Sequence, residues 1–200
     1  MQKYSIFNLI KNAFSNHEKW DLAWKDPTPK KEYDVVIIGG GGHGLATAYY
    51  LAKEHNITNV AIIEKGWIGG GNVGRNTTII RSNYMHDDNA LFSEFGMNLW
   101  RKMSQDLNYN VMFSPRGIIN LAHSDAQMNV YARRGNSMRL NGIDAELLNR
   151  EQVKEIIPMA DFSENVRFPI LGGLMQPSAG TARHDAVAWG YARQADTMGV

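Results

Sequence analysis

The pattern of apolar and polar positions is most informative between residues 34 and 64. Residues 35–38 are four β-branched apolar side chains in a row, which is typical of a strand buried in a parallel sheet. Residues 45–54 are rich in helix formers, and residues 60–63 are a second apolar run of strand type. This order predicts a strand, a helix and a parallel strand, the unit from which doubly wound α/β domains are built.

Glycines fill the predicted turn between the first strand and the helix, in the spacing Gly39-x-Gly41-x-x-Gly44. The first glycine allows the turn, the second lets a pyrophosphate approach the backbone, and the third lets the helix pack closely on the strand. The helix N-terminus carries roughly half a positive charge and favours phosphate. Glu64 ends the second strand, where ribose hydroxyls would need an acceptor.

These residues indicate a dinucleotide site, with a glycine-rich turn that binds no ligand as the plainer alternative. An acidic residue in place of an arginine cluster argues against a 2′-phosphate, so NAD and FAD are the two candidates. Lys65 either reaches the adenine side or stays solvated, and the geometry of the glycine turn does not by itself require His43 to face the ligand. The predicted binding residues here are Gly39, Gly41, Gly42, His43, Gly44, Glu64 and Lys65.

The middle of the chain lacks the alternation of strand and helix seen in the first part. Its pattern predicts a helix over 88–107, a strand over 117–122, a helix over 125–141 and a short helix from Asn149 that stops at Pro158. A second domain inserted into the first explains this change. The predicted organisation is an N-terminal extension (1–33), a dinucleotide-binding domain (34–104 and 176–200) and an inserted, partly β domain (105–175).

The last predicted helix has Asp185 as its N-cap and Gly199 after its end, with Val187, Tyr191 and Ala195 at helical spacing. A crossover helix of this kind normally leads to the next parallel strand, and none follows before residue 200. We therefore expect the sequence to be the N-terminal part of a longer protein, truncated at its C-terminus.

The N-terminal extension has apolar side chains at Ile6, Phe7, Ile10 and Phe14, and Trp20 and Trp24 one helical turn apart, before a proline-rich linker at 26–29. Two interpretations are open. The extension is either a surface helix packed on its own domain or a contact to another subunit, because exposed aromatic side chains favour interfaces.

Composition narrows the class of protein further. The 200 residues carry a formal net charge of +1 and 44% hydrophobic side chains, so binding to nucleic acid is not expected. No apolar run approaches the ~18 residues that span a membrane, and the N-terminus is not a convincing signal peptide. The chain has no cysteine and its six histidines are scattered, so no metal site is predicted, and the cytoplasm is the expected location.

Three features together resemble the FAD-dependent amine oxidases of the D-amino-acid oxidase and sarcosine oxidase superfamily. They are GGGGHGLATAYYLA with the later VAIIEKG, the TTIIR loop, and a helix near 185–198 that follows the inserted block. Within the superfamily the sequence is most similar to the β subunits of heterotetrameric sarcosine oxidases, most specifically in GGNVGRNTTIIRSNY and ARHDAVAWGYAR. The resemblance runs from about Tyr33 to Val200.

The resemblance implies a fold, two cofactors and a reaction. The fold is a Rossmann-like FAD-binding domain with an inserted, partly β substrate domain. Such β subunits oxidise sarcosine to glycine at noncovalent FAD and pass the electrons to FMN, which reduces oxygen to hydrogen peroxide. The FMN lies at the contact with the α subunit on a histidine that matches His184, and the other subunits (α, γ and δ type) transfer the one-carbon unit to tetrahydrofolate.

The resemblance also assigns single residues. Arg81 matches the arginine that binds the substrate carboxylate, through the two parallel hydrogen bonds that a guanidinium makes. Monomeric relatives have an arginine three residues earlier, where this chain has Thr78, and this departure leaves the local flavin electrostatics open. The second flavin loop of the family corresponds here to Asn72, Arg75, Asn76 and Thr77.

Two other functions stay open at this stage. One is a related FAD-dependent dehydrogenase acting on dimethylglycine, on another N-methyl amino acid or on glycerol 3-phosphate. The other is a nucleotide-binding fragment or docking subunit without catalysis.

Overall fold

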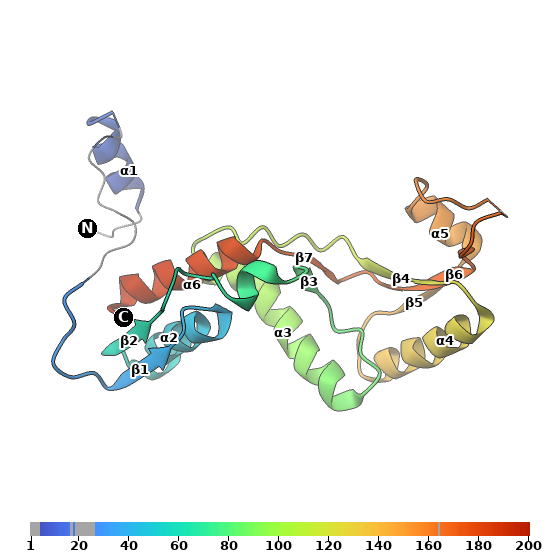
Figure 1. The fold of residues 1–200 in the computed structure, drawn as a ribbon, viewed down its shortest axis with the longest axis horizontal. Helices are drawn as coiled ribbons and strands as arrows, with labels where there is room; N and C mark the ends of the chain where they lie inside the picture. The colour runs from blue at the N-terminus through green and yellow to red at the C-terminus, as the bar shows by residue number, and fades with distance from the viewer. Residues whose placement is uncertain (1–4, 17, 19–26, 164) are drawn as a thin grey trace. The chain divides into compact units, whose positions relative to one another are not determined.

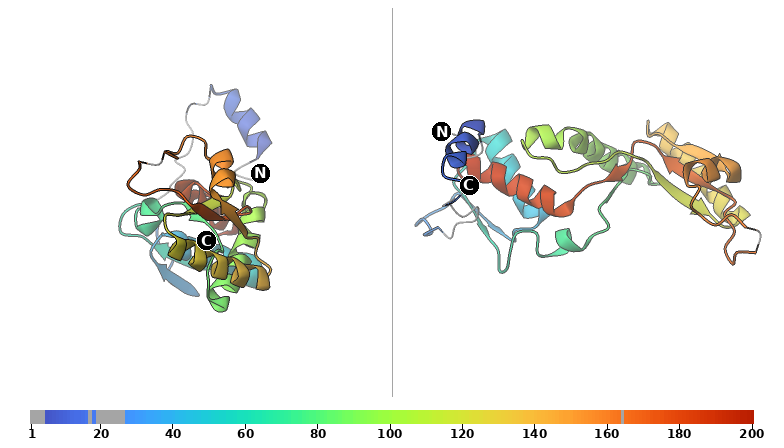
Figure 2. Two further views of the ribbon diagram at one scale, coloured as in Figure 1. Left: turned by 90° about the vertical axis from the view of Figure 1, so that its right-hand side faces the viewer. Right: turned by 90° about the horizontal axis from the view of Figure 1, so that it is seen from above.

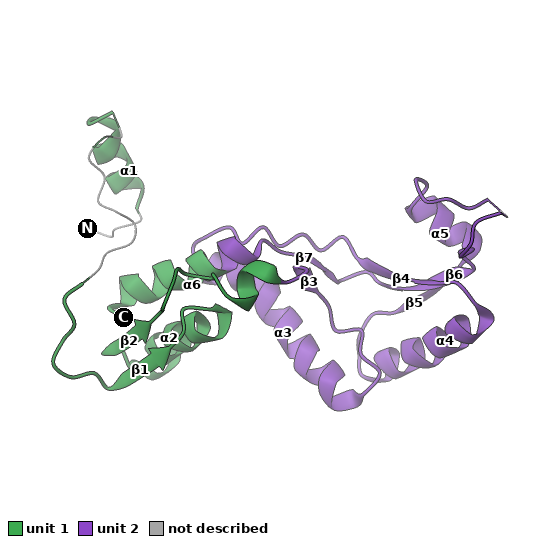
Figure 3. Cartoon of the chain, viewed as in Figure 1, with its two compact units in different colours: residues 1–75, 188–200 green, residues 76–187 purple. Residues whose placement is uncertain are grey.

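The computed structural model describes residues 5–16, 18, 27–163 and 165–200. The chain divides into two compact units (Figure 3). Unit 1 consists of Met1–Arg75 and Ala188–Val200, and unit 2 of Asn76–Val187. These limits fall at other residues than the predicted domain boundaries, since helix α3 and the segment around residue 80 belong to unit 2. The assignment of domains to cofactor and substrate remains a prediction.

Unit 1 contains the predicted strand, helix and strand. Strand β1 (Val35–Ile38) and strand β2 (Val60–Ile63) pair in parallel, and helix α2 (Gly42–His55) connects them. The apolar cluster beneath them is formed by Ala48, Val60 and Ala195, with Val35 and Ile37 packed against it. The β-α-β unit predicted from the apolar pattern is confirmed.

The strands of unit 1 are covered on one face only. Val36 and Ile38 are 51% and 89% exposed, whereas Val35 and Ile37 on the opposite face pack into the cluster with α2 and the end of α6. The expectation of a strand buried on both faces is therefore wrong for the described chain. Its physical reason is that both helices that contact the strands lie on the same side.

Helix α1 (Ile6–Ala13) of the N-terminal extension begins at the side-chain cap of Ser5. Its apolar side chains Ile6, Phe7 and Ile10, and Phe14 after its end, are all at least half exposed. They therefore add nothing to the apolar core. Trp20 and Trp24, which the sequence places one helical turn apart, lie outside the described residues.

Unit 2 contains an antiparallel sheet in the order β4–β6–β5, made of β4 (Ile118–Ala122), β6 (Gly172–Gln176) and β5 (Glu146–Asn149). Helix α4 (Asp125–Leu140) covers one face and helix α5 (Arg150–Ile156) the other (Figures 1 and 2). Leu174 of β6 packs on the α4 side and Met175 on the α5 side, as alternation along a strand requires. The strand and helices predicted for this block are confirmed to within a few residues.

Short elements complete unit 2. Strand β3 (Ile79–Ile80) pairs antiparallel with β7 (Gly180–Thr181), and helix α3 (Asp87–Asp106) follows β3. A 3-10 turn, η1 (Asn72–Arg75), precedes β3 in the sequence and belongs to unit 1.

Helix α6 (His184–Met198) confirms the last predicted helix but begins one residue earlier than expected. Asp185 lies in the first turn instead of capping it, and its two carboxylate oxygens accept hydrogen bonds of 2.9 and 2.8 Å from Arg183. Tyr191 and Ala195 are buried as predicted, and Gly199 follows the helix with φ +101°. Because the helix already begins at His184, Asp185 is its second residue, so the predicted N-cap is wrong.

Candidate functional site

The turn after β1 has the geometry that its glycines were predicted to allow. Gly39 has φ +108°, a left-handed conformation that side chains disfavour. A Cβ added at Gly44 would lie 2.0 Å from the carbonyl oxygen of Gly39 and 3.2 Å from Ile37 of β1. The third glycine is therefore required for α2 to pack against the turn and the strand.

Open space lies beside the first two glycines of the motif. A Cβ at Gly39 would meet no atom within 4 Å, and one at Gly41 would meet only Val73, at 4.0 Å. Gly41 is the N-cap of α2, so the first N–H groups of this helix have no acceptor within the helix. N–H donors without a helical acceptor, beside open space, are what a pyrophosphate needs, and His43 in the first turn is exposed.

Glu64 lies beside the glycine turn, directly after β2. Its Oε2 accepts a 2.7 Å hydrogen bond from the Gly40 N–H, and its Oε1 accepts one of 2.8 Å from Gly66. These two donors, the Gly40 N–H first, hold the pKa of the Glu64 carboxyl below its ordinary value. Each oxygen keeps further lone pairs, so the charged carboxylate can also accept from ribose hydroxyls. Lys65 next to it is exposed.

The structure brings the turn η1 against the glycine turn within unit 1. A Cβ at Gly42 would lie 3.0 Å from Val73, and Gly69 donates a 2.9 Å hydrogen bond to the Gly40 carbonyl oxygen. Asn72 and Arg75 of η1 are exposed. Predicted binding residues from two loops separated by nearly thirty positions therefore lie in one part of unit 1.

The remaining candidates lie in unit 2, along the paired strands β3 and β7. Thr78, just before β3, has φ +59° and accepts a 3.1 Å hydrogen bond from the Ala182 N–H, and its own N–H donates to the Asn76 side chain. His184 follows Ala182 by two residues, and its Nδ1 is buried without a hydrogen-bond partner. The ladder thus brings the segment of Asn76 and Thr77 close to the segment that leads to His184.

Arg81 follows β3 directly and is half buried. Its guanidinium carbon lies 5.6 Å from the centre of the Tyr84 ring, within the range of a cation–π contact. A guanidinium held over an aromatic face keeps its N–H donors available at the edge of the plane. Arg81 can therefore still present a fork to a carboxylate.

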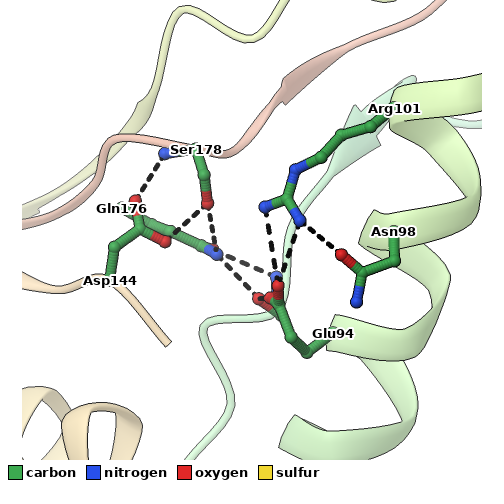
Figure 4. A network of polar contacts seen from close by, with 7 residues as sticks. Glu94, Asn98, Arg101, Asp144, Gln176 and Ser178 are labelled. Atoms are coloured by element: carbon green, nitrogen blue, oxygen red, sulfur yellow. Dashed lines mark hydrogen bonds and ion pairs between the residues drawn. The ribbon is translucent and has the colours of Figure 1, made fainter. Parts of the chain in front are cut away.

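Sequence reasoning missed the three polar side chains that the structure buries most completely among the described residues: Ser82, Asn83 and Gln176. Gln176 lies in a network of hydrogen bonds with Ser178, Asp144 and Glu94, shown in Figure 4. The one signal in the sequence was the polar pair Ser82–Asn83 directly after the apolar pair of β3. Nothing in the sequence links this pair to Gln176, 94 positions away.

The predicted site residues thus form two groups. Unit 1 holds Gly39, Gly41, Gly42, His43, Gly44, Glu64, Lys65, Asn72 and Arg75, and unit 2 holds Asn76, Thr77, Arg81 and His184. Within the part of the chain that the structure describes, no cluster of three histidine, aspartate or glutamate side chains has the arrangement of a metal site.

A glycine turn between parallel strands, with an acidic residue after the second strand, defines an α/β dinucleotide-binding protein. Residues 34–200 match the DAO family, described as FAD dependent oxidoreductase. The chain belongs to this family. The match decides between the two candidate dinucleotides in favour of FAD.

The comparisons also identify relatives by sequence. The chain is 60% identical over 198 residues to sarcosine oxidase subunit beta of Rhizobium meliloti (strain 1021), covering 99% of this chain and 47% of that protein. It is 53% identical over 200 residues to the protein of the same name in Rhodobacter capsulatus, covering 100% and 48%. The chain spans about half the length of the curated relatives that it matches.

The fold has a counterpart among solved structures. L-proline dehydrogenase from P. horikoshii superposes with a TM-score of 0.76 at 27% identity, covering 86% of this chain and 43% of that one. No helix within the described residues is long and apolar enough to cross a membrane.

Proposed function

We propose that this chain supplies the FAD-binding and substrate-contacting residues of a flavin-dependent sarcosine oxidase. The observation that carries the proposal is the 60% identity to a sarcosine oxidase subunit beta across 99% of the chain. The open glycine turn and the charged Glu64 carboxylate support it, because they fit an adenine dinucleotide.

The proposed reaction is the oxidation of sarcosine to glycine. Two electrons and two protons leave the N-methyl group and the amine, which gives an imine. Water hydrolyses the imine to glycine and formaldehyde, or tetrahydrofolate in the partner subunits takes up the one-carbon unit and glycine is released. Bound FAD supplies the electron acceptor, with transfer through FMN to oxygen giving hydrogen peroxide. The protein contributes position and electrostatics.

The pyrophosphate of FAD is assigned to the N–H groups at the start of α2, and its ribose to Glu64. Gly39 and Gly41 leave the space that this approach requires, and Gly44 lets α2 pack closely enough to present its first N–H groups. Asn72, Arg75, Asn76 and Thr77 are assigned to the ribityl chain and the ring. Lys65 is exposed and stays solvated.

Arg81 is assigned to the substrate carboxylate. Its position between β3 and a buried polar segment gives the guanidinium a fixed origin, and its contact with Tyr84 orients the plane of the fork. Two parallel charge-assisted hydrogen bonds then hold the carboxylate and place the N-methyl end of the substrate.

His184 is assigned to the covalent attachment of FMN. A neutral imidazole nitrogen is a suitable nucleophile toward an activated methyl group. Because Nδ1 is buried, Nε2 is the nitrogen available for the bond. Denatured holoprotein should then show flavin fluorescence on a gel, and His184→Ala should lose it; fluorescence retained by the variant would remove the assignment.

Partner subunits of α, γ and δ type are part of the proposal, since two of the relatives are named as beta subunits. The decisive experiment is anaerobic reduction of the full-length protein purified with its partners. Sarcosine should bleach the flavin absorbance, and acid should release FAD and leave FMN bound.

A second candidate is the oxidation of another secondary amine. The likeness to a proline dehydrogenase at 27% identity favours it, because proline is also a secondary amine with a carboxylate. Bleaching by proline, dimethylglycine or another N-methyl amino acid, with none by sarcosine, would replace the first function by the second. A complex that binds FAD but is bleached by no amine would instead have a docking role.

A further inference from the structure

The segment that follows Arg81 is held by a buried carboxamide. Gln176, at the end of β6, accepts a 3.0 Å hydrogen bond from the Ser82 N–H through Oε1 and donates one of 2.7 Å to the Ser82 hydroxyl through Nε2. Both residues are fully buried. One side chain thus satisfies the backbone and the side chain of the same residue.

The orientation of this carboxamide is determined by its partners. A backbone N–H can only donate, so the atom facing it must be the oxygen of Gln176. The hydroxyl of Ser82 then accepts from Nε2 and donates its own proton to Glu94 Oε2, 2.7 Å away. Gln176 thus donates to Ser82, and Ser82 donates to Glu94. A side chain at position 176 that cannot donate would remove the first of these two hydrogen bonds.

The backbone before Arg81 is fixed by strand pairing. Ile79 and Ile80 pair with Thr181 and Gly180 of β7, so the ladder ends one residue before Arg81. The carboxamide of Gln176 offers the same donor and acceptor as a peptide group and acts one residue after Arg81. Arg81 is therefore the single residue between two fixed points of the backbone.

A second amide supports the same segment. The Asn83 side chain donates a 2.7 Å hydrogen bond to Asn120 Oδ1 on β4, the strand next to β6. Asn83 is 1% exposed. The two residues after Arg81 are thus each bound to a different strand of the sheet, at the cost of burying three polar side chains.

We infer that Gln176 is a positioning residue that sets the origin of the Arg81 guanidinium and so determines the affinity for the substrate carboxylate. The inference rests on the proposed role of Arg81. Buried polar groups stabilise little beyond what they cost to desolvate, but a side chain whose donor and acceptor are both paired, as those of Gln176 are, specifies one geometry. A geometric role should therefore appear in substrate binding more than in stability.

The test uses full-length holoenzyme with its partner subunits, with rates expressed per bound FAD. Gln176→Glu keeps the shape and the acceptor but cannot donate to Ser82 when ionised. Ser82→Ala keeps the backbone bond and removes only the hydroxyl. We expect KM for sarcosine to rise about tenfold in the first variant, because the ionised side chain cannot donate to the Ser82 hydroxyl and places a charge in the buried network. We expect a rise of about threefold in the second, which loses the two hydrogen bonds of the hydroxyl, to Gln176 and to Glu94, but keeps the bond from the Ser82 N–H to Gln176. In both variants kcat should change less than twofold.

Ser178→Ala is the matched control. It removes the 3.4 Å contact to Gln176 and the single hydrogen bond of the serine hydroxyl to Asp144, and keeps the bond from the Ser178 N–H to Asp144. It should lower the melting temperature and leave KM unchanged. A rise in KM for Ser178→Ala equal to that of Gln176→Glu would show a general loss of structure and overturn the inference.

Arg81→Lys separates the inference from the function on which it rests. If Arg81→Lys leaves KM unchanged, the proposed carboxylate role fails whatever Gln176 does. If it raises KM and neither Gln176→Glu nor Ser82→Ala does, the inference alone fails. In the double variant of Arg81→Lys with Gln176→Glu, a positioning role predicts less than additive effects on KM, whereas independent effects would add and contradict it. If Gln176→Glu yields no holoenzyme, the cycle is run with Ser82→Ala.

Discussion

The two units present their candidate residues in opposite ways. In unit 1 the groups are mostly backbone N–H donors beside open space, set by glycines within six positions and by one carboxylate. In unit 2 they are side chains on a short ladder, supported by buried amides from distant parts of the sequence. In unit 1, a side chain added at a closely packed glycine such as Gly44 would clash with the backbone. In unit 2, each candidate side chain depends on hydrogen-bond partners that can be substituted one at a time.

The largest effect on FAD binding and stability is expected at Gly44, where the backbone of α2 lies against the backbone of the glycine turn. Gly44→Ala places a Cβ 2.0 Å from the Gly39 carbonyl oxygen, so α2 must move away from the turn. We expect loss of FAD binding and a destabilisation of about 3 kcal/mol, typical of a clash that the core cannot absorb. FAD content after purification and thermal unfolding measure both.

Gly71→Ala is the control for that clash, because a Cβ there meets no atom within 4 Å. It should leave FAD content and stability close to those of the unchanged protein. Equal loss in both variants would mean that unit 1 is sensitive to any substitution and not to the close approach.

A smaller effect is expected at the carboxylate of the unit 1 site, Glu64. Glu64→Gln keeps one oxygen that can accept from the Gly40 N–H, but it removes the charge and places an NH2 donor opposite the Gly66 N–H. FAD should bind about tenfold more weakly, as when one charge-assisted hydrogen bond is lost. Titration of the apoprotein with FAD measures the affinity. An unchanged affinity would contradict the assignment of Glu64 to the ribose of FAD.

Because the pKa of Glu64 is lowered, the effect of Glu64→Gln on stability should depend on pH. A carboxyl whose pKa is lower in the folded state stabilises the fold above its unfolded pKa, near 4.5, and loses this contribution as pH falls through the folded value. The difference in melting temperature between the unchanged protein and Glu64→Gln should therefore be full near pH 7 and shrink below about pH 4.5. A difference that grows on acidification would contradict this sign.

In unit 2 a modest effect is expected at the cap of α5. The Asn149 side chain accepts from the Gln152 N–H at 2.9 Å, and the Gln152 side chain accepts from the Asn149 N–H at 2.9 Å. Asn149→Ala should cost about 1 kcal/mol of stability without changing FAD content. Loss of flavin in this variant would show that unit 2 transmits local changes to the cofactor.

The smallest effect is expected at the ion pair beside His184. The side chains of Arg183 and Asp185 are more than half exposed, and their charged groups form two hydrogen bonds of 2.9 and 2.8 Å. Asp185→Asn should shift the melting temperature by less than about 2 °C, since exposed pairs contribute little. Flavin fluorescence of the denatured protein should persist, which distinguishes this neighbour from His184.

Part of this structure could be predicted from the chain because its causes are local. The apolar runs at 35–38 and 60–63 and the glycine spacing determine the β-α-β unit, since strand period, turn and close approach each depend on neighbouring residues. The same holds for α5, where Asn149 and Gln152 form the predicted start of the helix.

Other features could not be predicted because spacing and apolar character do not show which partner a group will find. The prediction of Asp185 as the N-cap is wrong because the helix begins at His184, so Asp185 lies in the first turn and its carboxylate pairs with Arg183. The exposure of Val36 and Ile38 could not be predicted, because apolar character shows that a strand can be buried but not which of its two faces is covered by another element.

By itself the sequence determined the dinucleotide turn, the acidic residue after the second strand and the order strand, helix, strand around them, because each follows from short-range sterics and hydrogen bonding. Only the tertiary structure decided that Ser82 and Asn83 are buried and that Gln176 binds the residue after Arg81. The reason is physical: a polar side chain can be buried only where a distant partner satisfies it, and the fold alone brings that partner into place.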